Sequence, residues 1–271
     1  MSPTEERNPK SMNLDRMPLA KAIRLMLTED AKIPQKLLKE ARKIEKITEA
    51  ITKAFRHGGR LFYVGAGTSG RLGMLDASEC PPTFRIPREM VQGVIAGGDV
   101  ALRKSVEGAE DDSGAGAQEI QSRKVDGRDV VIGIAASGTT PYVWGALREA
   151  KRRRATTVLI CFNPHLEIPK EYQPTIVIAP NLGPELLTGS TRLKAGTATK
   201  LLLNIFSTLA MVKDGKVIGN LMVHLNPSNA KLRDRATRIV QELTSVNYAN
   251  AREALEQSGW VINKAVARLK K

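Results

Sequence analysis

Two short turns rich in glycine and hydroxyl side chains have the residue types best suited to bind a ligand. They read GAGTSG and SGTT, and each follows an apolar run. Their hydroxyl-bearing residues are Thr68, Ser69, Ser137, Thr139 and Thr140. Hydroxyls and the free backbone N–H groups of a helix amino terminus both donate hydrogen bonds to phosphate oxygens. The pair of turns therefore predicts a site for a compact phosphate monoester.

The first turn also matches the G-x-G-x-x-G pattern of dinucleotide-binding folds. Those folds place an acidic residue about 20 residues further on, at the end of the second strand. Glu89 has that spacing, but it precedes the next apolar run, which begins at Val91. A dinucleotide is therefore disfavoured. Serine and threonine after a strand are also ordinary helix caps, so one such turn favours neither interpretation, whereas two favour phosphate.

Short β-branched runs alternate with helix-like segments in the middle of the chain. The runs are Leu61 to Val64, Val91 to Ala96, Val130 to Ala135, Thr157 to Phe162 and Thr175 to Ala179. This alternation predicts an α/β fold in which a parallel sheet is sandwiched between helices. Both hydroxyl turns then lie at the carboxyl edge of the sheet, where such folds bind ligands.

Helical segments precede and follow the predicted sheet. Leu19 to Met26 and Ile33 to Phe55 have helical apolar spacing, and a long apolar helix is expected over Ala198 to Val212. A break at residues 213–216 precedes two or three basic amphipathic helices. We expect an amino-terminal helical arm (residues 1–56), a ligand-binding α/β domain (57–215) and a carboxyl-terminal helical region (216–271).

The net charge of +14 over 271 residues raises the question of a nucleic-acid partner. The basic residues are spread over several predicted helices, and aromatic residues make up only 4% of the chain. The chain therefore lacks the aromatic side chains on which the bases of single-stranded nucleic acid stack. Solvated helix faces explain the charge better, so a nucleic-acid partner is not expected.

The cysteines and histidines suggest neither a disulfide framework nor a metal site. Cys80 and Cys161 are far apart without C-x-x-C spacing, and the three histidines share no metal-ligand spacing. Cys80 is expected to fill the core. The polar start of the chain has no leader-like apolar segment, and no apolar stretch is expected to cross a membrane. These observations favour a reducing cytoplasm.

Four segments resemble signature segments of the N-acetylmuramic acid 6-phosphate etherases, bacterial enzymes of the sugar isomerase (SIS) domain superfamily. They are GAGTSGRLGMLDASECPPTF, VEGAED, GIAASGTTPYV and LTGSTRLKAGTATKLLLNIFST. The resemblance covers residues 4 to 245. It implies an SIS-like fold for residues 57–215, no metal or nucleotide cofactor, and a phosphosugar substrate. It also implies cleavage of a D-lactyl ether to N-acetylglucosamine 6-phosphate and D-lactate, in amino sugar catabolism and cell-wall recycling.

That activity requires an acid and a base. Opening the sugar ring exposes a C1 aldehyde that acidifies the C2 proton; a base removes this proton, an acid protonates departing lactate, and water adds to the unsaturated aldehyde. By resemblance, Glu79 is the acid and Glu110 is the base. Glu107 is spaced i, i+3 from Glu110, so on a helix both share a face and Glu107 can position Glu110. Pro81 and Pro82 are expected to end the helix just after Glu79.

The length of the helix predicted after the first turn indicates whether one subunit can form a complete site. If residues 70–79 form a straight helix, Glu79 lies roughly 14 Å from the phosphate turn, which one sugar hardly spans. Either this helix bends sharply or each site draws residues from two subunits, and a homodimer is the simpler expectation. The apolar segments Leu37 to Phe55 and Ala198 to Val212 are the expected contacts.

Other functions compete with an etherase: a non-catalytic sugar-phosphate sensor, a sugar-phosphate isomerase and a nucleic-acid-binding regulator. The glucokinase regulatory protein, which binds sugar phosphates without turnover, shares the glycine-threonine-serine turn more distantly. Glutamates at both family positions favour turnover. The arm before Leu61 is too short for a separate helix-turn-helix domain. The segment Thr188 to Thr197 either binds substrate anions or caps the next helix, and Glu185 has the same two interpretations.

Overall fold

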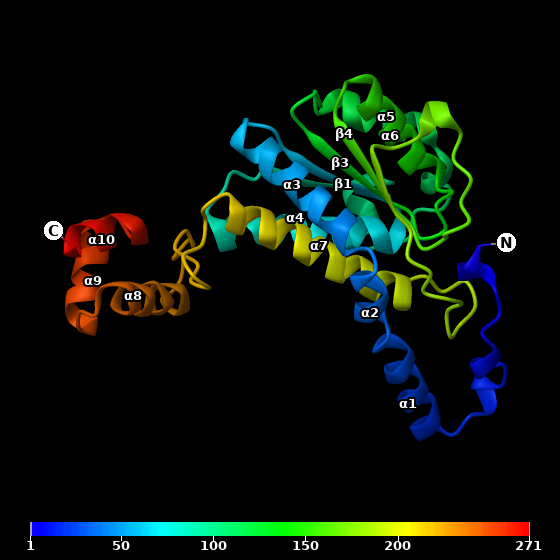
Figure 1. The fold of residues 1–271 in the computed structure, drawn as a ribbon, viewed down its shortest axis with the longest axis horizontal. Helices are drawn as coiled ribbons and strands as arrows, with labels where there is room; N and C mark the ends of the chain where they lie inside the picture. Colours follow the sequence, from blue (N-terminus) through cyan, green and yellow to red (C-terminus); the bar gives the residue numbers. More distant parts are fainter. Residues whose placement is uncertain (1, 271) are drawn as a thin grey trace.

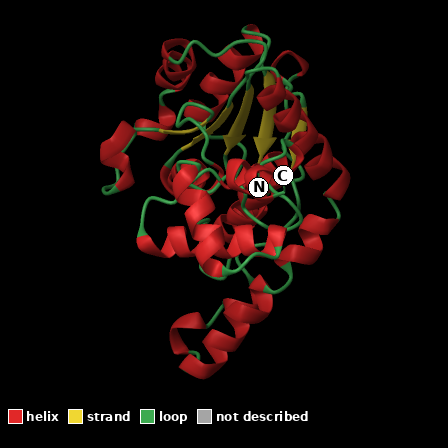
Figure 2. Cartoon of the chain, turned by 90° about the vertical axis from the view of Figure 1, so that its left-hand side faces the viewer, coloured by secondary structure: helices red, strands yellow, loops and turns green. Residues whose placement is uncertain are grey.

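The computed structural model describes residues 2–270, in which a parallel sheet is enclosed by helices on both faces (Figures 1 and 2). The strands are β1 (Leu61–Gly65), β2 (Val91–Ile95), β3 (Val130–Ile134), β4 (Thr156–Ile160) and β5 (Ile176–Ile178). They pair in the order β2-β1-β3-β4-β5, and every pair is parallel. The predicted α/β sandwich is confirmed, and each strand ends within two residues of its predicted run.

The helices of the arm and of the sheet region follow the predicted segments with one exception. They are α1 (Leu19–Asp30), α2 (Ile33–Leu38), α3 (Ala41–Arg56), α4 (Gly67–Phe84), α5 (Ser113–Ser122), α6 (Pro141–Arg152) and α7 (Lys194–Lys213). The prediction of one helix over Ile33 to Phe55 is wrong, because the chain turns between α2 and α3, where Glu40 N–H bonds the Leu37 carbonyl. The turn lets Ile33 and Leu37 enter the core together with α7.

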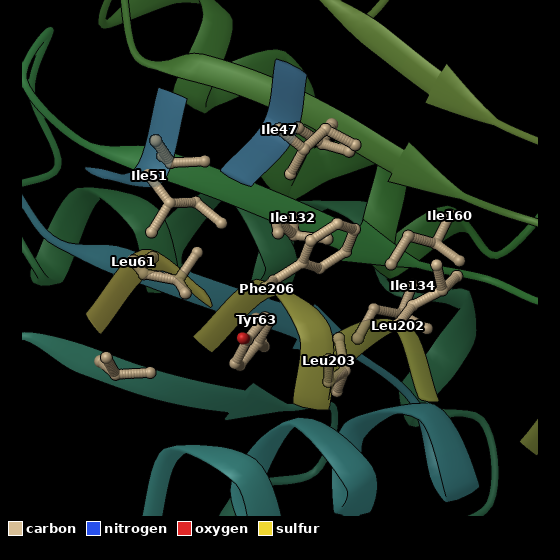
Figure 3. Packing of buried hydrophobic residues seen from close by; sticks show 14 of the residues in the cluster. Ile47, Ile51, Leu61, Tyr63, Ile132, Ile134, Ile160, Leu202, Leu203 and Phe206 are labelled. Atoms are coloured by element: carbon tan, nitrogen blue, oxygen red, sulfur yellow. The ribbon is translucent and has the colours of Figure 1, made fainter. Parts of the chain in front are cut away.

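Side chains alternate between the two faces of the sheet, as the strand period requires. Leu61 and Tyr63 join a core formed with α3, α4 and α7, where Ile51 and Phe206 pack against them (Figure 3). Phe62 joins a second core, formed with α5 and α6. Both faces are therefore dry, which explains why the strands are almost continuously apolar.

Helix α7 is long and apolar enough, by length and composition alone, to cross a membrane. The expectation that no apolar stretch reaches this length is wrong. The helix is apolar because one of its faces covers the sheet, where Leu202, Leu203 and Phe206 are fully buried (Figure 3).

The carboxyl-terminal helices lie beside the sheet region and have a core of their own (Figure 1). They are α8 (Ala230–Thr244), α9 (Tyr248–Gln257) and α10 (Ile262–Leu269). Asn226 N–H bonds the Pro82 carbonyl at 3.1 Å, and Arg85 bonds the Trp260 carbonyl at 3.4 Å. The division into three regions stays a prediction, since α2 and α3 of the arm pack on α7.

Candidate functional site

The strand order places both hydroxyl turns at one point of the sheet. In a parallel sheet of order 2-1-3-4-5, the connections leave β1 and β3 in opposite directions, and ligands bind beyond the carboxyl ends of these two strands. Gly65 and Ile134, the last residues of β1 and β3, are paired in register. The two turns therefore start from neighbouring strands, about 4.8 Å apart.

The first turn enters α4 so tightly that two of its three glycines, Gly65 and Gly70, have no room for a side chain. A Cβ on Gly65 would lie 2.7 Å from the Gly70 nitrogen, and one on Gly70 would lie 2.5 Å from Ile95 Cγ1. Thr68 and Ser69 occupy the first turn of α4, and within residues 2–270 no hydrogen bond engages their hydroxyls. They do not cap the helix, so these donors are available to a ligand together with the free N–H groups beside them.

The hydroxyls of the second turn also do not cap the helix that follows them. The Ser137 and Thr139 hydroxyls are 2.8 Å apart and hydrogen-bonded, and Ser137 Oγ also accepts from Thr139 N–H at 3.3 Å. Thr140 occupies the N-cap position of α6, but its side chain accepts no capping bond. All three hydroxyls are at least partly exposed. The capping interpretation therefore does not describe how either turn is used in the fold.

The start of α7 lies against the first turn. A Cβ on Gly196 would lie 3.6 Å from Thr68 Cγ2, so the segment Thr188 to Thr197 lies at the same edge of the sheet. The cap of α7 comes from Glu185, whose carboxylate accepts from Lys194 N–H at 3.0 Å and from Ala195 N–H at 2.9 Å. Burial raises the pKa of Glu185, and the two N–H bonds oppose that rise. Glu185 is thus a structural cap, which the sequence left open.

The loop after β2 brings Glu110 towards the hydroxyl turns. It contains the 3-10 turns η4 (Gly98–Leu102) and η5 (Ala109–Asp111). Arg71 of α4 donates to the Leu102 and Lys104 carbonyls at 3.3 Å each and ties the loop to the helix that begins at the first turn. Since η5 also packs against α6, Glu110 is held between the helices that carry the two turns.

The expectation that Glu107 and Glu110 share a helix face is wrong. Gly108 lies between them with φ +72°, a conformation that interrupts any helix. Glu107 is in irregular chain, whereas Glu110 is in η5, and both side chains are exposed.

Glu79 lies apart from these groups. It is exposed on α4, which runs without interruption from Gly67 to Phe84, so the expectation that prolines end the helix after Glu79 is wrong. Pro81 and Pro82 lie in the last turn, which Arg85 closes in the left-handed conformation by donating to the Pro81 carbonyl at 2.9 Å. Ten residues of helix separate Ser69 from Glu79, or about 15 Å. One chain does not bring Glu79 to its own hydroxyl turns.

Glu79 instead borders a cavity of about 390 Å³ between α4 and α7. Asp76, Lys200 and Asn204 also line it. Sequence reasoning did not select Asp76 or Lys200. The one available signal was that Asp76 is a charged residue at an apolar position of a helix, three residues before Glu79.

A larger apolar groove of about 1030 Å³ runs along the outer side of α3 and α7. Leu38 at its edge is 70% exposed, and Leu209 in its wall is 47% exposed. The residues described form no group of three or more His, Cys, Asp or Glu side chains that could share a metal ion. Cys80 and Cys161 are free and buried, and Cys80 packs in the core as predicted.

Comparison with known proteins gives two close curated relatives. The chain is 50% identical to an N-acetylmuramic acid 6-phosphate etherase of Pectobacterium atrosepticum, over 98% of this chain and 87% of the relative. It is 49% identical to that of Yersinia pestis, over 99% and 90%. A family model described as the glucokinase regulatory protein N-terminal SIS domain matches residues 42–151.

Two solved structures share the fold at low sequence identity. One is an E. coli CFT073 protein solved in complex with a ligand, with a TM-score of 0.52 and 14% identity, covering 75% of this chain and 97% of that chain. The other is a phosphoheptose isomerase from Francisella tularensis, with a TM-score of 0.50 and 17% identity, covering 74% and 100%. At these identities the likeness establishes the fold alone.

Proposed function

Since this chain belongs to the N-acetylmuramic acid 6-phosphate etherases, we propose that the hydroxyl turns after β1 and β3 hold the phosphate of its substrate. The enzyme is a carbon–oxygen lyase that cleaves the D-lactyl ether of N-acetylmuramic acid 6-phosphate by elimination and then hydration. Its products are N-acetylglucosamine 6-phosphate and D-lactate. One observation carries the assignment of the phosphate site: two adjacent strand ends present hydroxyls that the fold does not use as caps.

The same geometry supports different roles for the two glutamates. Glu110 lies on the loop held beside the phosphate turns, so it is the base that removes the C2 proton of the open-chain sugar. Glu79 is the acid that protonates the lactate oxygen as the bond to C3 breaks. The pair of electrons from the C2–H bond forms the C2–C3 double bond, and water then adds at C3.

We propose that the enzyme is a homodimer with shared sites, because about 15 Å of α4 separate Ser69 from Glu79 of one chain. The groove between α3 and α7 is the proposed contact, and a second copy of the chain is its occupant. In a single chain, the groove leaves the apolar side chains of Leu38 and Leu209 exposed to water, and a second copy of the chain would cover them. In this arrangement, Glu79 of one subunit faces the phosphate turns of the other.

We also place the enzyme in the cytoplasm and its reaction in amino sugar catabolism and cell-wall recycling. Cys80 and Cys161 are free thiols in the core, as is usual in a reducing compartment.

Release of D-lactate from N-acetylmuramic acid 6-phosphate tests the function. The methyl glycoside of the same substrate cannot open its ring, so it should bind without releasing lactate. In ¹⁸O-labelled water, the label should enter C3 of the amino sugar and stay out of lactate. Binding without lactate release would favour a sensor, and exchange between aldose and ketose forms would favour an isomerase.

A further inference from the structure

The cavity beside Glu79 has features that its acid role alone does not explain. It lies between α4 and α7 and is lined by both polar and apolar side chains. Asp76, Glu79, Lys200 and Asn204 are among the polar ones, and Phe84, Val217 and Met222 are among the apolar ones. We propose that this cavity binds the lactyl group of the substrate, with Lys200 as the cation for its carboxylate and the apolar side chains for its methyl group.

The proposal rests on the proposed function, which puts Glu79 at the ether oxygen. In a lactyl ether, one carbon separates the ether oxygen from the carboxylate. A group that recognises the carboxylate must therefore lie within a side-chain length of the acid. Lys200 meets this condition because it lines the same cavity as Glu79.

Lys200 is free to take a carboxylate. Its Nζ donates to Asn204 Oδ1 at 2.7 Å, and within residues 2–270 it forms no salt bridge. The residue is partly exposed and the bond to Asn204 is open to solvent, so the ammonium group is accessible to a ligand carboxylate and can form a charge-assisted hydrogen bond with it. Its charge acts on the buried side of the cavity, where it lowers the pKa of Asp76 against the larger effect of burial.

Asp76 supplies a second, independent observation. Its side chain is buried, with the residue only 4% exposed, and Oδ1 accepts from Ser207 at 3.2 Å. Oδ2 is buried and has no hydrogen-bond partner among the residues described, and Asp76 is one of the residues that line the cavity. The buried Tyr63 hydroxyl is also unpaired; burial raises the pKa of the Asp76 carboxyl, and Tyr63 and Ser207 oppose that rise. Buried polar atoms without partners are rare, so Asp76 Oδ2 is suited to accept from a ligand hydroxyl or a bound water. Lactate acquires a hydroxyl there when the ether bond breaks.

Two carboxyl groups share the cavity with Lys200. In its acid role, Glu79 holds a proton until the ether bond breaks. Ser207 donates to Asp76 Oδ1 at 3.2 Å, so this oxygen is already engaged by α7.

Binding measurements with Lys200→Met test the subsite, using Glu110→Gln as the common background so that substrate is not consumed. Lys200→Met should weaken binding of N-acetylmuramic acid 6-phosphate by about tenfold to a hundredfold. Binding of N-acetylglucosamine 6-phosphate, which has no lactyl group, should change less than about twofold on the same scale. Lys200→Arg should restore much of the lost affinity, and Lys231→Met on α8 is the matched control for loss of one positive charge.

A substrate analogue with a lactamide in place of lactate gives a test that does not depend on folding of the variant. The protein that retains Lys200 should bind N-acetylmuramic acid 6-phosphate more tightly than its lactamide analogue. Equal affinity for acid and amide, or equal weakening of both sugar phosphates by Lys200→Met, would overturn the subsite. Release of D-lactate by the wild-type enzyme would leave the proposed function standing in that case, and its absence would remove both.

Discussion

Ser207 Oγ donates a hydrogen bond to Asp76 Oδ1 at 3.2 Å and so joins the middle of α7 to the buried side of α4. Both residues are almost inaccessible to solvent. This bond satisfies only one of the two carboxylate oxygens. Asp76 is therefore a charged group kept in the core at a cost to stability, as is common where a residue serves a site.

Asp76→Asn should stabilise the fold at neutral pH by about 1 kcal/mol, because the amide removes a desolvated charge. Burial raises the pKa of Asp76 above its ordinary 3.8. Its protonated form therefore supports the fold below pH 3.8, and that contribution is lost as pH rises through the folded pKa. Urea denaturation should show that Asp76→Asn increases the free energy of unfolding more at pH 7 than at pH 4. Ser207→Ala is the control and should destabilise.

Substitution of the two glutamates should have different effects on exchange of the substrate's C2 hydrogen with solvent. Glu110→Gln should lower lactate release by about 10² to 10⁴ and abolish exchange of the C2 hydrogen with solvent deuterium, because the base is lost. Glu79→Gln should reduce lactate release comparably while C2 exchange persists. Mass spectrometry of recovered sugar phosphate measures the exchange. The reverse pattern would exchange the two roles.

Shared sites predict complementation between inactive subunits. A co-refolded mixture of Glu79→Gln and Ser69→Ala chains should recover about a quarter of wild-type activity, since half of the dimers are mixed and each contains one intact site. A mixture of Ser69→Ala with Thr68→Ala chains should recover nothing, because both changes affect the same turn. If neither mixture recovers activity, although mixed dimers form, the sites are not shared.

The groove between α3 and α7 should control the oligomeric state. Leu209→Asp introduces a charge into the proposed contact, so sedimentation should show monomers for this variant and dimers for the wild type. Ile218→Asp is a matched control, since both residues are 47% exposed and Ile218 does not line the groove. An unchanged dimer in Leu209→Asp would place the interface elsewhere.

The amino-terminal arm should loosen in acid through Glu29. Burial alone would raise the pKa of Glu29, but hydrogen bonds from Lys10 and Lys32 outweigh it and lower that pKa from 4.5 to about 2. The carboxylate therefore stabilises the fold above pH 4.5, and this contribution is lost as pH falls towards 2.

Glu29→Gln should lower the free energy of unfolding by about 2 kcal/mol at pH 7. It should also make the free energy of unfolding depend less on pH between pH 4.5 and about 2. Glu242→Gln, at an exposed position on α8, is the control. The same acid dependence in both variants would contradict the assignment.

The local pattern of apolar and polar residues was sufficient to predict most of the fold. Apolar β-branched runs located every strand to within two residues, because each strand is buried on both faces and needs such side chains along its whole length. The same patterns selected both hydroxyl turns, and the resemblance selected Glu79 and Glu110. They failed between α2 and α3 and at Gly108, where the chain turns without a marked change in composition. They also failed at Pro81, where α4 continues through two prolines that were expected to end it.

The sequence by itself determined the sheet, the edge of the sheet at which the two hydroxyl turns lie, and the family. Only the tertiary structure decided that Glu185 caps α7, that α4 keeps Glu79 about 15 Å from Ser69, and that Lys200 faces the cavity beside Glu79. The physical reason is that a hydrogen bond or an ion pair depends on distances of a few ångströms between helices. Sequence spacing fixes such distances within one helix, whereas between α4 and α7 they follow from how both helices pack on the sheet.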